Sequence, residues 1–221
     1  MNDGAQRRER LAASRLYLVV ESVAGGRPAE PIVAAALEGG ADLVQLRDKE
    51  AGDDSILEAA ARFRELCAEH GALFVLNDRA DLAARCGADA VHVGQDDARV
   101  EEARAVVGPD LLIGLSTHAP GQFAAGLESG ADYLCAGPVH ETPTKPGRPA
   151  TGLGYVRHAA AHADGRPWFA IGGIDTSNVA EVAEAGAGRV VVVRAIRDAD
   201  DPRAVARELR TALETGVGAA R

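Results

Sequence analysis

Lysine is nearly absent from this chain. The sequence of 221 residues holds 24 basic residues, and only two of them are lysines, Lys49 and Lys145. Acidic residues outnumber basic ones, and the formal net charge is −9 at pH 7. Nucleic acids and anionic membrane surfaces need a basic face, so neither is expected as a partner. Both lysines follow predicted strands, and we favour a functional position for them over chance placement on the surface.

Long apolar runs and paired cysteines are missing too. The first apolar run, 16–20, is too short for a signal peptide, and no run reaches the length of a membrane span. The three cysteines, Cys67, Cys86 and Cys135, are odd in number and show no CxxC spacing. This argues against a disulfide framework or a zinc site, so we expect a cytoplasmic protein in which the cysteines are small buried residues.

The composition is that of an ordinary globular protein. Hydrophobic residues make up 47% of the chain and charged residues 26%, and no segment has the composition of a linker. We therefore expect one domain over residues 1–221, with frayed ends at 1–13 and 215–221.

Short apolar runs alternate with helical segments along the chain. Eight runs, rich in β-branched residues, predict strands at 16–20, 43–46, 73–76, 90–93, 111–115, 133–136, 168–171 and 190–193. Between them, helical periodicity is clear at 31–37, 56–70, 100–107, 179–185 and 204–213. Such alternation is typical of βαβ units and a parallel sheet.

A short repeat supports this interpretation. Gly-Ala-Asp recurs at 40–42, 87–89 and 130–132, each time between a predicted helix and the next strand, and 186–188 is a degenerate copy. Eight such units favour a (β/α)8 TIM barrel over an open doubly wound sheet, because the loop after the first strand lacks the GxGxxG fingerprint. In a TIM barrel the loops that follow strands carry the active groups.

A basic cluster follows the second predicted strand. Gln45, Arg47 and Lys49 lie there, and an Arg fork with a compact Lys charge suits a diphosphate or polyphosphate. The alternative is a solvated loop in which Asp48 pairs with Arg47 or Lys49.

Acidic residues follow the third and fourth predicted strands. Asn77 and Asp78 follow one strand, and Asp96 and Asp97 follow the next. Parallel strands bring both loops to the same face, and one or two carboxylates with substrate phosphates form a common Mg²⁺ site. The alternative for Asp96 or Asp97 is capping of a helix that begins near Ala98, and we favour Asp96 as the cap.

Later loops add donors for an anion. Ser116 and Thr117 can bind a polar ring or cap a helix, and we favour satisfied polar roles for His92 and His118. The long loop after the sixth strand carries Thr142, Thr144, Lys145 and Arg148 without local counter-charges. After the seventh strand, Gly172 and Gly173 lie where TIM barrels bind phosphate through backbone N–H groups, beside Arg194, which follows the eighth strand.

Six motifs together resemble one family. They are QLRDK at 45–49, ND at 77–78, HVGQDD at 92–97, GLSTH at 114–118, GPVHETPTK at 137–145 and AIGGI at 170–174. In order and across nearly the whole barrel, they resemble the thiamine phosphate synthases. The resemblance implies a transferase that condenses hydroxymethylpyrimidine diphosphate with hydroxyethylthiazole phosphate, giving thiamine phosphate and pyrophosphate.

The resemblance also implies a role for each matched position. Asp78 and Asp97 would bind Mg²⁺, while Ser116 would contact the pyrimidine. The other implied contacts are with the pyrimidine diphosphate (Gln45, Arg47, Lys49 and Asn77), with the thiazole phosphate (Thr142, Thr144 and the Gly173 backbone) and with the departing pyrophosphate (Lys145). Arg47, Lys49 and Lys145 would be the catalytic cations. The family commonly has Ser where this chain has Arg194, whose part in binding the thiazole phosphate is left open.

The expected mechanism is dissociative, because an electron-rich aminopyrimidine stabilises positive charge on its methylene. Two other functions compete with it. A thiazole tautomerase would need an acid or base such as His118 but not the diphosphate and metal groups, and a non-catalytic sensor of a thiamine precursor would have similar ligand contacts. The expected partners are small phosphorylated molecules, and a homo-oligomer is left open.

Overall fold

The computed structural model describes residues 4–142 and 149–218. In this part of the chain, eight parallel strands close into a barrel in the order β1-β10-β9-β8-β7-β6-β5-β4. Their bounds are β1 Leu16–Val20, β4 Leu43–Leu46, β5 Leu73–Asn77, β6 Ala90–Val93, β7 Leu112–Thr117, β8 Tyr133–Ala136, β9 Trp168–Ile171 and β10 Val190–Val192. The predicted TIM barrel and its strands are confirmed.

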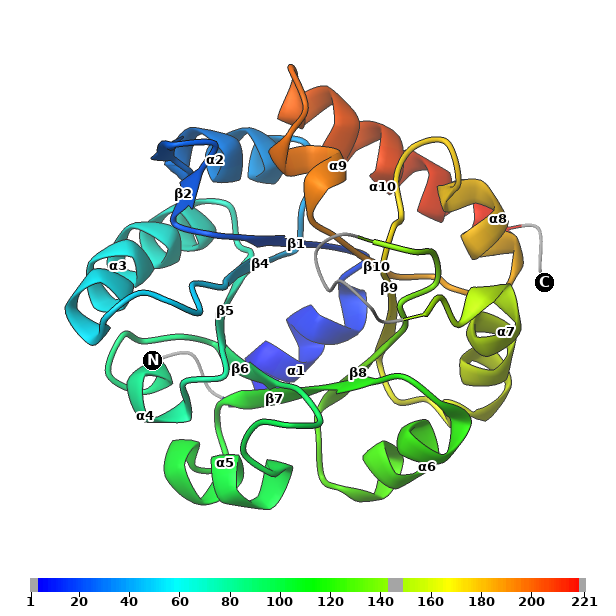
Figure 1. Cartoon of the computed structure of the whole chain (residues 1–221), viewed down its shortest axis with the longest axis horizontal. Helices are drawn as coiled ribbons and strands as arrows, with labels where there is room; N and C mark the ends of the chain where they lie inside the picture. The colour runs from blue at the N-terminus through cyan, green and yellow to red at the C-terminus, as the bar shows by residue number, and fades with distance from the viewer. Residues whose placement is uncertain (1–3, 143–148, 219–221) are drawn as a thin grey trace.

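Helices form a ring outside the strands (Figure 1). Their bounds are α2 Glu30–Glu38, α3 Asp53–Glu69, α4 Ala80–Ala83, α5 Val100–Val107, α6 Pro120–Glu128, α7 Gly152–His162, α8 Val179–Glu184, α9 Arg194–Arg197 and α10 Pro202–Gly218. A small antiparallel pair, β2 Val23–Ala24 and β3 Arg27–Pro28, lies in the first strand-to-helix connection. None of the helices in the described residues is long and apolar enough to cross a membrane.

The strands are buried on both faces. Along β1, Tyr17 and Val19 belong to the cluster inside the barrel, whereas Leu16, Leu18 and Val20 pack outward against the helices. Both the inward-facing and the outward-facing positions of β1 are therefore apolar. Strands of this kind appear as continuous apolar runs in the sequence.

The N-terminal segment from Gly4 is ordered, contrary to the expectation from the sequence. Residues up to Ala13 were expected to be frayed, but Gly4–Ala13 forms helix α1, which is visible within the ring of strands in Figure 1. Leu11 packs into the interior cluster, and Arg7 and Arg8 form ion pairs with Asp89 and Asp132 near the starts of β6 and β8. Helix α1 therefore covers the N-terminal end of the barrel, held by charged contacts that apolar periodicity does not reveal.

Fraying was expected from residue 215, and the backbone of α10 extends to Gly218. Residues 219–221 lie outside the described part of the chain.

The Gly-Ala-Asp repeat has a structural role at the end of the barrel where the strands begin. Gly40, Gly87 and Gly130 have φ of 99°, 70° and 81°, as expected for glycines that end helices in the left-handed region. The aspartates accept backbone N–H groups from the neighbouring strand. Asp42 Oδ2 accepts from Leu16 at 3.0 Å, Asp89 Oδ2 from Phe74 at 3.0 Å and Asp132 Oδ2 from Ile113 at 2.8 Å. Each repeat therefore anchors the start of one strand to the next.

Replacing one repeat aspartate is expected to destabilise the barrel. Asp89→Ala leaves the buried N–H of Phe74 and the guanidinium of Arg7 without the carboxylate that joins them. We expect a loss of about 2–4 kcal/mol in the free energy of unfolding, measured by urea denaturation. The exposed Asp200 provides the control, and Asp200→Ala should stay within about 0.5 kcal/mol of wild type. A comparable small loss in both variants would contradict the anchoring role.

Candidate active site

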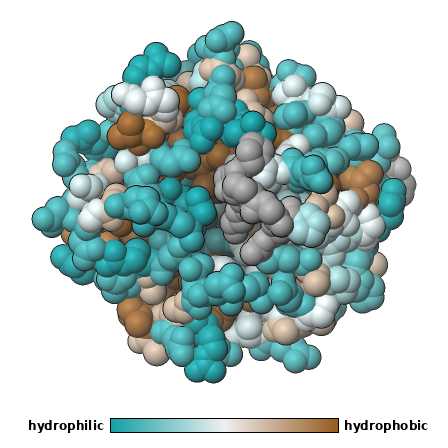
Figure 2. All heavy atoms as spheres, viewed as in Figure 1, coloured by the Kyte–Doolittle hydropathy of each residue, from teal (hydrophilic) through white to brown (hydrophobic). Residues whose placement is uncertain are grey.

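The loops that follow the strands surround a hollow in one face of the barrel, and hydrophilic residues gather around it (Figure 2). Two cavities adjoin here. The smaller, of about 70 Å³, is lined mostly by residues of β1 and β4–β7 and the loops after them, and the larger, of about 330 Å³, mostly by residues of β9 and β10 and the loops after β8–β10. Ser116, Ile171, Val191 and Val193 line both cavities. Two ligands bound in them would therefore meet at this shared wall.

The smaller cavity collects the residues predicted for the pyrimidine diphosphate substrate and its metal. It is lined by seven of them: Gln45, Arg47, Lys49, Asn77, Asp78, Asp97 and Ser116. The Lys49 ammonium lies 3.3 Å from Asp78 Oδ2. Residues that are 71 positions apart in the sequence thus line one small volume, as the barrel topology predicts.

Asp78 and Asp97 form a pair of carboxylates in contact. Burial raises the pKa of Asp78, the hydrogen bond and charge of Asp97 raise it further, and Lys49 opposes the change. Asp97 Oδ2 also accepts the backbone N–H of Gly94 at 2.9 Å. The backbone of Asp78 has φ of 59°, an uncommon conformation outside glycine that directs this side chain from the end of β5.

This carboxylate pair fits a divalent cation. Two acidic side chains brought together in a half-buried place repel each other unless a proton or a cation lies between them. The described residues contain no cluster of three or more His, Cys, Asp or Glu side chains suited to a metal. Mg²⁺ commonly takes one or two carboxylates and completes its shell with substrate phosphate and water, so a site of two carboxylates suits it.

The raised pKa of Asp78 predicts how the metal-free protein responds to pH. The folded protein holds this proton more tightly than the unfolded chain does, so stability should fall as pH rises from the ordinary aspartate pKa through the raised value. Mg²⁺ held by this pair would compete with the proton and should bind more weakly as pH falls through the same range. Urea unfolding of wild type and Asp78→Asn, with and without Mg²⁺, measures both effects. Parallel stability curves for the two proteins across this range would contradict the assignment.

Two alternatives raised by the sequence are wrong. Asp96 does not cap the following helix, because α5 begins only at Val100 and the Glu102 carboxylate accepts the N–H of Arg99 at 3.0 Å. Asp48 was offered as a partner for Arg47 or Lys49, but its carboxylate accepts the N–H of Ser22 at 3.1 and 3.2 Å. Asp48 thus fixes the loop after β1 and leaves Lys49 to pair with Asp78.

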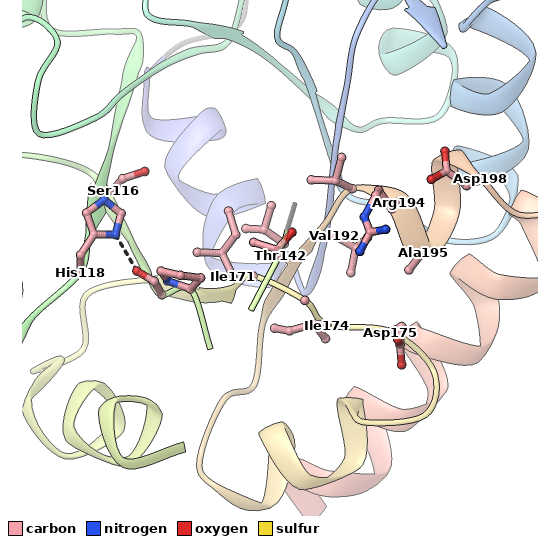
Figure 3. A pocket seen from close by; sticks show the side chains of 16 residues that line it. Ser116, His118, Thr142, Ile171, Ile174, Asp175, Val192, Arg194, Ala195 and Asp198 are labelled. Atoms are coloured by element: carbon pink, nitrogen blue, oxygen red, sulfur yellow. Dashed lines mark hydrogen bonds between the residues drawn. The ribbon is translucent and has the colours of Figure 1, made fainter. Parts of the chain in front are cut away.

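His92 and His118 both have hydrogen-bond partners within the protein, as expected from the sequence. His118 Nδ1 lies 2.6 Å from the carbonyl oxygen of Gly137 (Figure 3). His92 is buried between Tyr133 and Ser116, with its two ring nitrogens 3.2 Å and 2.9 Å from their hydroxyl oxygens.

The larger cavity collects residues predicted for a monophosphate. Figure 3 shows Ser116 and His118 on one side, Arg194, Ala195 and Asp198 on the other, and Thr142 between them. Arg194 begins the short helix α9, and its side chain is exposed. Two predicted contacts, Thr144 and Lys145, lie outside the described residues.

Gly172 and Gly173 shape the floor of this cavity. Their φ values are 106° and 65°, and a Cβ at Gly173 would lie 2.7 Å from His140 Cβ. Asn178 holds the turn, because its Nδ2 donates to the Gly173 carbonyl at 2.8 Å and its Oδ1 accepts the N–H of Asp175 at 2.9 Å. Helix α8 starts only at Val179, so the glycines lie in a turn rather than opening the helix directly.

Sequence reasoning missed several residues of these cavities. Tyr17, Cys135, Ile171, Val191 and Val193 contribute to the smaller cavity, although they belong to or adjoin buried strands and look like ordinary core residues. The only sequence signal for them is the alternation of side chains along each strand, which identifies the inward-facing positions once the barrel is assumed.

Comparison with known proteins gives a consistent result. Residues 16–196 match the family described as thiamine monophosphate synthase. The chain is 51% identical to thiamine-phosphate synthase of Saccharopolyspora erythraea, with 96% of this chain and 98% of the relative covered. It is also 51% identical to that of Streptomyces avermitilis, with 93% and 96% covered.

A solved structure extends the likeness to three dimensions. Thiamine phosphate pyrophosphorylase from Pyrococcus furiosus superposes with a TM-score of 0.86 at 34% identity, covering 96% of this chain and 99% of the other.

Proposed function

Since the chain belongs to the thiamine monophosphate synthase family, whose close relatives are transferases, we propose that it condenses hydroxymethylpyrimidine diphosphate with hydroxyethylthiazole phosphate. The products are thiamine phosphate and pyrophosphate. The observation that carries this proposal is the pair of adjoining cavities, one lined by acidic, basic and amide groups and the other by two turn glycines, Thr142 and Arg194.

The smaller cavity suits the diphosphate. Arg47 and Lys49 would bind its oxygens, with Gln45 and Asn77 as neutral partners of the same substrate. Asp78 and Asp97 would hold Mg²⁺, whose charge would stabilise the departing diphosphate. With substrate bound, the Lys49 ammonium would interact with both Asp78 and the phosphate oxygens. This supports a role for Lys49 in holding the leaving group.

The larger cavity suits the thiazole phosphate. The backbone N–H of Gly173 and the hydroxyl of Thr142 would donate to its oxygens, and Arg194 at the rim would add a positive charge. From the sequence alone, we propose Thr144 as a further contact of the thiazole phosphate and Lys145 as a contact of the departing pyrophosphate.

The proposed reaction is a dissociative substitution at the pyrimidine methylene. The bond from this carbon to the diphosphate oxygen breaks first, and its electron pair leaves with pyrophosphate. The thiazole nitrogen then gives its lone pair to the methylene and forms the new C–N bond. Arg47, Lys49 and Lys145 act by holding charge on the leaving group, so no protein nucleophile is required.

The direct test mixes purified protein with both substrates and Mg²⁺ and follows pyrophosphate and thiamine phosphate. Formation of both products supports the proposal. Isomerised thiazole phosphate without pyrophosphate would instead identify a thiazole tautomerase, and binding without turnover would identify a sensor of thiamine precursors. Each of those two outcomes overturns the proposed synthase.

We also propose a cytoplasmic site of action. The thiols of Cys67 and Cys86 are not joined to other cysteines, which supports a reducing compartment.

A further inference from the structure

A row of hydrogen-bonded side chains crosses the interior of the barrel. The Gln45 amide nitrogen donates to the Tyr17 hydroxyl, which lies 3.1 Å from the Tyr133 hydroxyl. The Tyr133 hydroxyl lies 3.2 Å from His92 Nδ1, and His92 Nε2 lies 2.9 Å from Ser116 Oγ. All five side chains are at most 6% exposed. The row thus joins β4 to β7 through three intervening residues, none of them singled out for catalysis.

The hydrogen bonds of the row are consistent with one direction. In this assignment Tyr17 accepts a hydrogen bond from Gln45 and donates to Tyr133, which in turn donates to His92 Nδ1. Burial raises the pKa of both phenols well above the usual tyrosine value, so both protons are retained. In the same assignment neutral His92 carries its proton on Nε2 and donates a hydrogen bond to Ser116 Oγ.

The two ends of the row line the smaller cavity, as do Tyr17 and His92 within the row. At one end the Gln45 nitrogen donates to Tyr17, and the amide oxygen Oε1 can accept from a ligand. At the other end, when Ser116 Oγ accepts a hydrogen bond from His92, its own hydroxyl can donate to a ligand. In this assignment the cavity offers the Gln45 oxygen as an acceptor and the Ser116 hydroxyl as a donor.

We propose that the hydrogen bonds of the row take this direction, so that Tyr17, Tyr133 and His92 are positioning residues that set Gln45 as the acceptor and Ser116 as the donor for an aminopyrimidine, and thereby select against an oxopyrimidine. This inference rests on the proposed function. An exocyclic amino group donates and its neighbouring ring nitrogen accepts, which complements the two ends of the row. A 4-oxo ring reverses both roles, so it would leave buried polar groups unpaired.

Packing holds the rings of the row in place. Gly114 on β7 leaves room for two of them, because a Cβ there would lie 2.1 Å from the Tyr133 ring and 2.5 Å from His92 Nδ1. Phe169 makes edge contacts with both Tyr17 and Tyr133, at ring centroid distances of 5.5 Å and 5.7 Å. The hydroxyls therefore have little freedom to choose other partners.

The first test needs no substrate. In protein labelled with ¹⁵N-histidine, we expect the His92 signals of the Nε2-protonated neutral tautomer, and Tyr133→Phe should change them. Tyr155→Phe is the matched control, because Tyr155 is also a buried phenol but donates to Thr117 Oγ1 at 2.7 Å, outside the row. A proton on Nδ1 in wild type, or signals unchanged in Tyr133→Phe, would overturn the proposal.

The second test measures selectivity. Tyr17→Phe keeps the ring but interrupts the row, and we expect about a 10-fold loss in kcat/KM for the aminopyrimidine diphosphate. The preference over the 4-oxo analogue should shrink, while the KM for thiazole phosphate should stay unchanged. An unchanged preference would overturn the proposal. If wild type makes no thiamine phosphate, the proposed function fails, but the His92 tautomer measurement still tests the direction of the hydrogen bonds in the row.

Discussion

Asp78→Asn is expected to lower kcat for pyrophosphate release by about 100-fold or more at saturating substrate. Asparagine is similar in size and tolerates the left-handed backbone that Asp78 adopts at φ 59°, so the fold should be preserved. What is lost is one of the two carboxylates in contact, and with it the charge that would hold Mg²⁺ beside the diphosphate. Pyrophosphate release, followed as Mg²⁺ is varied, measures the effect.

A neighbouring acidic residue provides the control for this prediction. Asp96 is exposed and adjacent in sequence to Asp97, but it does not line the smaller cavity. Asp96→Asn removes the same charge from the protein and should retain activity within about 2-fold, because exposed charges at this distance are screened by salt. Equal losses in the two variants would show that overall charge rather than a metal site governs the reaction.

Gly173→Ala is the second substitution with a large expected effect. Its φ of 65° is unfavourable for alanine, and the new Cβ would lie 2.7 Å from His140 Cβ and 3.0 Å from the Glu141 carbonyl oxygen. The segment before Thr142 would have to move away from the turn. We expect kcat/KM for thiazole phosphate to fall by about 100-fold, with little change in the binding of pyrimidine diphosphate.

A glycine elsewhere provides the matched control. Gly154 lies in α7, and a Cβ there would meet nothing within 4 Å. Gly154→Ala should therefore leave both substrates unaffected. Steady-state kinetics with each substrate varied in turn separates the two cavities. A loss in Gly173→Ala that falls equally on both substrates would point to general misfolding instead of damage to one subsite.

The barrel was predictable because its signals are local and repeated. Continuous apolar runs mark strands buried on both faces, and the glycines of the Gly-Ala-Asp repeat mark helix ends. The grouping of Arg47, Lys49, Asp78 and Asp97 followed from topology alone, since successive parallel strands end on one face.

What failed depended on contacts between distant residues. Helix α1 is held by ion pairs of Arg7 with Asp89 and Arg8 with Asp132, which span 82 and 124 residues and leave no periodic apolar pattern. The polar row in the barrel was missed for a similar reason. Tyr17 and Tyr133 lie inside apolar strands, where a tyrosine gives no sign of whether its hydroxyl has a partner.

The most direct test of the account is a ³¹P NMR measurement of a reaction with both substrates, run with Mg²⁺ and again with excess EDTA. The account predicts thiamine phosphate and pyrophosphate in equal amounts with Mg²⁺ and neither product with EDTA. Pyrophosphate formed without thiamine phosphate, or equal turnover in EDTA, would contradict it.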